Sequence, residues 1–142
     1  MDLLDGRILD FPHGLPGFET ATRFVLKQQP SFAPVSFLKA TDTPDLCFLV
    51  IPVQSILPDY SLAVTADDLR TLALEETRQP EIGKDALCLA ILTAPEQGPL
   101  TANLLAPVVI NLAAGRGVQA VRSDAVYSHR HVIAALETEA GC

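Results

Sequence analysis

The few residues whose types and spacing could support chemistry gather near the end of the chain. His129 and His131 form an H-x-H pair, and Cys142 follows them. Histidine and cysteine bind transition metals, but a metal site needs three or four ligands that converge. The remaining histidine, His13, is far away in the sequence. We therefore interpret the pair as surface residues and expect neither a metal nor a cofactor.

Nucleophilic catalysis has no better support in the sequence. There is no G-x-S-x-G motif, so no serine lies on a recognisable nucleophile elbow. Cys47 and Cys88 occur in apolar runs, where a free cysteine behaves as a small core residue, although the sequence alone leaves a Cys–His pair open. Residues 14–17 do not form a phosphate-binding loop, because the stretch is too short and carries no Lys-Ser or Lys-Thr.

Paired carboxylates are the last class of candidates for acid–base catalysis. They are Asp42 with Asp45, Asp67 with Asp68, and Glu75 with Glu76. The second and third pairs fall in an expected helix, which explains them without catalysis. Asp42 and Asp45 flank a proline in a turn, where aspartate is common because its side chain bonds the local backbone. We expect a protein that is not an enzyme.

Composition limits the remaining function classes. The chain has 142 residues, which predicts one domain over residues 1–142. Its hydrophobic content of 49% excludes a disordered chain. The net charge of −7 disfavours contact with nucleic acid and favours a basic protein partner. The first residues do not resemble a signal peptide and no apolar run could span a bilayer, so we expect a cytoplasmic protein with no membrane partner.

The apolar run from Thr101 to Leu112, TANLLAPVVINL, is the stretch around which the fold must be organised. Pro107 lies in its middle and disfavours a continuous helix, because proline has no N–H and its ring clashes with the preceding turn. We therefore expect two buried strands, 102–106 and 108–112, bent at Pro107. Asn103 and Asn111 flank the run, and their amides should bond backbone across the bend, because an unsatisfied buried amide is costly.

Other short apolar or alternating segments predict further strands, at residues 7–11, 23–27, 35–40, 46–51, 86–93 and 118–122. Gly14, Pro16 and Gly17 force a turn after the first of them, and Phe18 is expected to pack back as a plug. Residues 116–117 predict a hairpin turn.

One helix is expected to begin after Thr65, which can cap it together with Asp68, and to fade towards residue 80. A second short helix is expected over residues 128–139. Seven or eight short strands with one or two short helices predict a mainly β fold. The expected architecture is a small antiparallel β-barrel-like or sandwich domain.

Five segments together carry a resemblance to a known family. They are GLPGFE at 14–19, DLCFLV at 45–50, TANLLAPVVIN at 101–111, GVQAV at 117–121 and YSHRH at 127–131. In this order and at these separations they resemble the FliW family of flagellar assembly factors, over about residues 7–131. Residues 70–84 diverge from that pattern, and the end of the chain after His131 has no counterpart in it.

The resemblance implies a small cytoplasmic β-barrel-like protein without catalytic activity. It further implies two protein partners, flagellin and CsrA, a small basic dimer that binds RNA and regulates translation. Flagellin competes for the factor, and after flagellin export the released factor sequesters CsrA, which relieves repression of flagellin translation. The net charge of −7 agrees with a basic partner.

The resemblance leaves the binding surface open. Exposed carboxylates in loops are the first candidates for contact with CsrA, namely Glu19, Asp42 and Asp45. Gly14, Pro16, Gly17, Phe18, Asn103, Pro107 and Asn111 are expected to serve as structural residues of the motif. Two other functions remain as alternatives: a small β-barrel enzyme with an acidic or histidine-containing pocket, and a structural subunit that self-assembles through its sheet edges.

Overall fold

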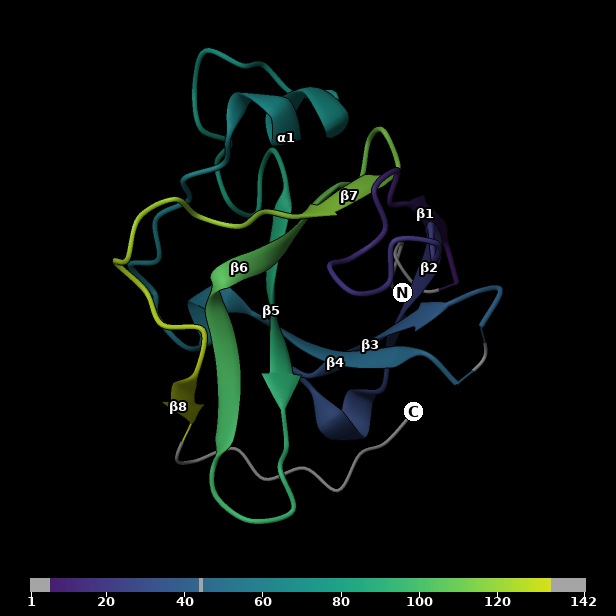
Figure 1. Ribbon diagram of the computed structural model, residues 1–142, viewed down its shortest axis with the longest axis vertical. Helices are drawn as coiled ribbons and strands as arrows, with labels where there is room; N and C mark the ends of the chain where they lie inside the picture. The colour runs from purple at the N-terminus through teal and green to yellow at the C-terminus, as the bar shows by residue number, and fades with distance from the viewer. Residues whose placement is uncertain (1–5, 44, 134–142) are drawn as a thin grey trace.

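The fold is a closed ring of strands with one covering layer, seen in a computed structural model that describes residues 6–43 and 45–133 (Figure 1). Its strands are β1 Ile8–Asp10, β2 Arg23–Gln28, β3 Ser36–Ala40, β4 Cys47–Pro52, β5 Leu87–Thr93, β6 Leu100–Asn111, β7 Arg116–Gln119 and β8 His131–Ile133. The described helices are α1 Ala66–Thr71 and two 3-10 turns, η1 Pro30–Phe32 and η2 Val53–Ser55.

Strand pairing closes the sheet into a barrel. The strand order is β5-β4-β3-β2-β1-β7-β6, and β5 also pairs with β6, which completes a ring of seven strands. Strand β8 adds to β6 outside this ring. The predicted mainly β, barrel-like fold is confirmed, and the closed ring decides against a sandwich. One pairing departs from the expected antiparallel arrangement, because β1 and β7 are parallel through Asp10 and Arg116.

Two hydrophobic clusters hold the structure together. Strands β1 to β6 fill the barrel interior with side chains such as Leu9, Phe11, Phe24, Leu38, Val50 and Ile110. Alternation explains this, since Phe24 and Leu26 are buried while Arg23 and Lys27 are exposed. The second cluster joins the other face of β4–β7 to the covering layer of residues 53–82, through Val53, Leu62, Leu69, Leu72, Cys88 and Leu104. The thiol of Cys88 is buried and free, and burial raises its pKa to about 12.

Helix α1 begins where its sequence predicted. Thr65 Oγ1 accepts a hydrogen bond from the Asp68 backbone N at 3.2 Å, and Leu69 is buried against the second cluster. The helix ends at Thr71, earlier than expected, because Ala73 takes a left-handed backbone with φ of 60°. Beyond it, ion pairs between arginines and acidic side chains organise the loop instead of further helical turns.

Strand β6 bends in its middle, as Pro107 predicted (Figure 1). It is one continuous strand and not two, because its pairing with β5 persists on both sides of the bend. The register shifts between Leu89 and Ile91, so residues 104–107 form a bulge opposite Ala90. Proline is tolerated at such a bulge because the ladder there needs fewer backbone donors.

The bulge is also where β6 changes neighbours. Its second half pairs with β7 and its first residues pair with β8. Between them, the segment 120–128 takes over the exposed edge: Ala120 N donates to Pro107 O at 2.8 Å, and Arg122 N donates to Leu105 O at 3.0 Å. The edge of β6 is thus covered by a connection rather than by a strand.

Three local predictions at the C-terminal side are corrected. The turn after β6 spans residues 112–115, with φ of 67° at Gly115, so residues 116–117 already belong to β7 and the predicted strand 118–122 begins earlier. Gly117 is needed for another reason, since a Cβ there would overlap the buried Phe11 ring. The expected helix over 128–139 is wrong for His131–Ile133, which form β8; the rest of that range and Cys142 lie outside the described residues.

Candidate partner-binding groove

The glycine-containing loop of residues 14–19 closes one end of the barrel. Gly14 has φ of 62°, and a Cβ there would come within 2.5 to 2.8 Å of the Phe18 and Glu19 backbone, so only glycine fits. Leu15 is the residue that plugs the interior, with 1% of its surface exposed. Phe18 is 43% exposed, and its ring lies 5.5 Å from that of the half-buried Phe48. The expectation that Phe18 is the plug is therefore wrong.

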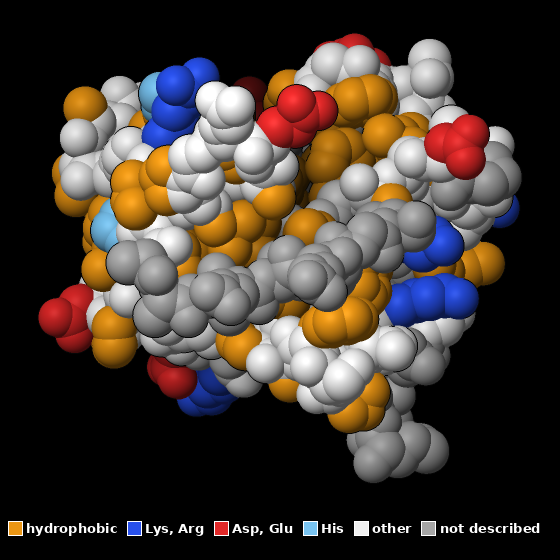
Figure 2. All heavy atoms as spheres, turned by 90° about the horizontal axis from the view of Figure 1, so that it is seen from below, with side chains coloured by type: hydrophobic (Ala, Val, Ile, Leu, Met, Phe, Trp, Pro, Cys, Tyr) orange, Lys and Arg blue, Asp and Glu red, His pale blue; other side chains and the backbone are white. Residues whose placement is uncertain are grey.

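A groove of about 760 Å³ opens beside this loop. Its lining includes side chains of β5 and β6 and residues between these strands, among them Pro95 and Pro99. Figure 2 views the molecule from below and shows hydrophobic side chains gathered on this face, with charged side chains mainly towards its edges. A cavity of this size and character is typical of sites that receive a ligand or a partner's side chains.

All five segments that carry the sequence resemblance contribute to the groove. In chain order they supply Pro16, then Phe48, then Thr101 and Asn103, then Gln119, and finally His129 and Arg130. Phe48, Gln119, His129 and Arg130 were not among the expected partner-binding residues. Their position inside the resembling segments was the available signal for them.

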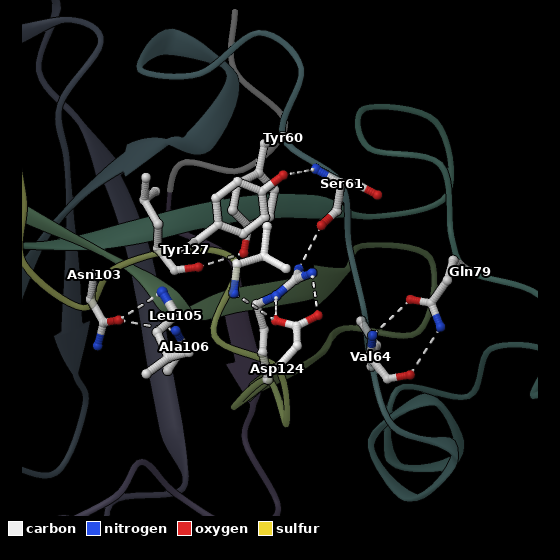
Figure 3. Close-up of polar contacts among 12 residues, drawn as sticks. Tyr60, Ser61, Val64, Gln79, Asn103, Leu105, Ala106, Asp124 and Tyr127 are labelled. Atoms are coloured by element: carbon white, nitrogen blue, oxygen red, sulfur yellow. Dashed lines mark hydrogen bonds and ion pairs between the residues drawn. The ribbon is translucent and has the colours of Figure 1, made fainter.

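Two amide side chains support the wall of the groove. Asn103 Oδ1 accepts hydrogen bonds from the backbone N of Leu105 at 3.1 Å and of Ala106 at 3.0 Å (Figure 3). Gln119 Nε2 donates to Ala106 O at 3.0 Å. Asn103 and Gln119 thus satisfy backbone groups that the bulge removes from the β5–β6 ladder. Among the described residues, no partner bonds the Asn103 Nδ2 or the Gln119 Oε1.

The second expected asparagine has a different role. Asn111 is buried at the end of β6, where its Nδ2 donates to Leu72 O at 2.8 Å and its Oδ1 accepts from Ala113 N at 3.2 Å. It therefore connects the barrel to the end of α1 and shapes the following turn. The expectation that it bonds across the Pro107 bend is wrong, because the bend is served by Asn103.

A buried arginine fixes the segment 120–128 that continues the groove wall. The Arg122 side chain is only 5% exposed and forms a double hydrogen bond with Asp124, at 2.9 and 3.0 Å. It also donates to Ser61 O, and its guanidinium lies 4.8 Å from the centre of the Tyr127 ring. The hydrogen bonds with Asp124 raise the pKa of Arg122 and lower the pKa of Asp124.

Two tyrosines complete this arrangement (Figure 3). The Tyr60 and Tyr127 rings stack with centres 4.3 Å apart. Tyr60 OH donates to Leu104 O at 2.6 Å, and Tyr127 OH accepts from Ser61 N at 3.0 Å. Burial raises the pKa of Tyr60 to about 12. The cluster joins the covering layer, the β6 bulge and the segment 120–128 into one unit.

The predicted acidic candidates lie near the start of β2 and β4. Glu19 ends the glycine-containing loop, and its Oε2 accepts a hydrogen bond from Gly17 N at 2.8 Å. Asp42 and Asp45 lie in the β3–β4 turn, which reaches the start of β2 through a hydrogen bond from Thr41 N to Arg23 O at 2.9 Å. All three carboxylates are exposed.

The remaining predicted chemistry does not converge. Over residues 6–43 and 45–133, no group of three or more His, Cys, Asp or Glu side chains is arranged to hold a metal ion. His129 lines the groove, His131 begins β8, and His13 bonds Thr71 Oγ1 at 3.1 Å. Cys47 is half-buried and is not a free thiol, unlike the interpretation from sequence. None of the described helices is long and apolar enough to cross a membrane.

Comparison with known proteins identifies the family of this architecture. The family model described as FliW protein matches residues 1–133. The chain belongs to the FliW family. A relative named flagellar assembly factor FliW, from Geotalea uraniireducens (strain Rf4), is 34% identical over 132 residues, which cover 92% of this chain and 77% of the relative.

Further comparisons agree with this assignment. A second protein of the same name, from Heliobacterium modesticaldum, is 32% identical over 99% of this chain and 90% of its own length. A crystal structure of the flagellar assembly factor FliW superimposes with a TM-score of 0.78 at 29% identity, covering 93% of this chain and 89% of that one. The FliW likeness thus extends over the described barrel, its covering layer and the groove.

Proposed function

We propose that this FliW-family chain is a non-catalytic cytoplasmic binding protein with two protein partners, flagellin and the translational regulator CsrA. In this role it binds newly made flagellin, and when flagellin is exported it sequesters CsrA and relieves repression of flagellin translation. The observation that carries the proposal is the groove, because residues from all five family-like segments converge on it. Segments that each match the pattern of one family and that meet at one surface are expected to share a binding role.

Charge supports the assignment of CsrA to another part of the surface. The family resemblance implies that CsrA is a small basic dimer, and this chain carries a net charge of −7. We propose that the exposed carboxylates of Glu19, Asp42 and Asp45 attract it. Such charges at the edge of an interface mainly raise the association rate and its dependence on salt.

Calorimetric titration of the purified chain with flagellin monomer and with CsrA, separately, tests the proposal. We expect saturable binding to each partner. A matched titration with an unrelated acidic β-barrel protein controls for nonspecific attraction to basic CsrA. Absence of binding to both partners, at concentrations where the chain is folded, would contradict the proposed function. Formation of a large homo-oligomer would instead favour the self-assembling subunit.

A further inference from the structure

We propose that the groove holds an extended segment of flagellin, in which apolar residues flank a carboxylate that pairs with Arg130. This inference rests on the proposed function, which supplies the two partners, and it adds which of them the groove selects and by what chemistry. The groove residues Asn103 and Gln119 bond the backbone of the segment.

Charge is the first argument. The chain has 17 acidic residues. Among the residues that the structure describes, no acidic side chain lines the groove, and Arg130 is the one permanently charged lining residue. The Arg130 side chain is exposed, and within the described part of the chain no carboxylate lies within ion-pair distance of it. An unpaired arginine in a largely apolar groove favours a partner's carboxylate and disfavours a basic partner. Of the two proposed partners, this favours flagellin over the basic CsrA as the occupant of the groove.

Hydrogen-bonding capacity is the second argument. Asn103 uses its oxygen on the bulge backbone and retains its Nδ2, whereas Gln119 uses its nitrogen and retains its Oε1. Both side chains line the groove. One free donor and one free acceptor match the C=O and N–H that an extended peptide presents along one edge. Because the same amides are held by the bulge, they lose little rotamer freedom on binding.

Shape is the third argument. A volume of about 760 Å³ accommodates a few side chains but not a folded domain. The apolar lining includes Phe48, Ile91 and Val132, and Val132 is 55% exposed. Burying these surfaces requires apolar side chains from the occupant. The segment that fits is therefore extended, mostly apolar and acidic at one position.

The test measures binding of flagellin monomer and of CsrA to wild type and to R130E by surface plasmon resonance. The matched control is K27E, which makes the same charge change at an exposed lysine on β2 outside the groove lining. We expect R130E to weaken flagellin binding by about tenfold or more, because a carboxylate then faces a carboxylate, with CsrA binding retained. K27E should bind both partners like wild type. Melting temperatures of the variants should match wild type.

A second variant tests the amide contacts. N103D keeps an oxygen for the bulge but replaces the free donor with a charged acceptor, so it should fold normally and also lose flagellin affinity. If wild type binds flagellin and R130E binds it equally well, the groove assignment is overturned while the proposed function stands. Loss of CsrA alone in R130E would overturn it too. If wild type binds neither partner, the proposed function itself fails. A wild-type homodimer that R130E abolishes would assign the groove to a second copy.

Discussion

Asn103→Ala probes the bulge that shapes both strand β6 and the groove. The substitution removes one oxygen that accepts two backbone N–H bonds, from Leu105 and Ala106. Each such bond contributes about 0.5–1.5 kcal/mol net, so the loss should lower the free energy of unfolding by about 1–3 kcal/mol. The lower part of this range applies if water reaches the two N–H groups, since the site is only half-buried.

Urea unfolding followed by far-UV circular dichroism measures this change, with the m-value checked to be constant. Asn103→Asp is the matched control, because it retains the accepting oxygen and should stay within about 0.5 kcal/mol of wild type. Equal stability of Asn103→Ala and wild type would refute the reasoning, since it would mean that the bulge does not depend on the amide. Equal losses in both variants would show that the nitrogen, and not the oxygen, is the stabilising atom.

Three further outcomes are expected. Gly14→Ala should lower the free energy of unfolding in urea by more than Gly17→Ala. Both glycines have positive φ, but only at Gly14 would an added Cβ overlap neighbouring backbone atoms, and equal losses would contradict this. Arg122 lowers the pKa of Asp124, so this pair stabilises the fold above the ordinary aspartate range near pH 4 and the contribution is lost as pH falls through the lowered pKa. Asp124→Asn should therefore flatten the acid limb of a stability–pH curve, and an unchanged limb would contradict the role of the pair. Replacing three exposed carboxylates with alanine should slow CsrA association and reduce its salt dependence, with little change in dissociation, as stopped-flow measurements at several salt concentrations can show. The three carboxylates are those of Glu19, Asp42 and Asp45. Equal association rates at low salt would remove them from the interface.

Local patterns predicted the elements that local physics determines. The alternation in β2, the Thr65 cap of α1 and the bend at Pro107 each depend on neighbours in sequence. Barrel closure does not, because the β5–β6 pairing and the parallel β1–β7 pair are long-range contacts that no local pattern specifies. The turn after β6 was misplaced because Gly115 and Gly117 both permit positive φ, and only the packing of Phe11 distinguishes them.

The candidate site was predicted less well for a similar reason. Either Leu15 or Phe18 could fill the end of the barrel. Which of them does so depends on the space inside the barrel, which the sequence does not show. The groove combines residues from distant segments, so its lining follows only from the fold. Arg122 was missed entirely; an arginine at the end of an apolar strand, with Asp124 two positions later, was the signal for a buried ion pair.

The central claim, that the chain switches between flagellin and CsrA, can be tested in one competition measurement. CsrA is first bound to a fluorescent RNA from the flagellin message, and fluorescence anisotropy is followed as the purified chain is added. We expect the chain to release the RNA. Subsequent addition of flagellin monomer should restore RNA binding, because the groove-lining Pro16 and the CsrA candidate Glu19 belong to one loop and the two partners would therefore compete there. RNA that stays bound to CsrA at saturating concentrations of the chain, or release that flagellin does not reverse, would contradict the account.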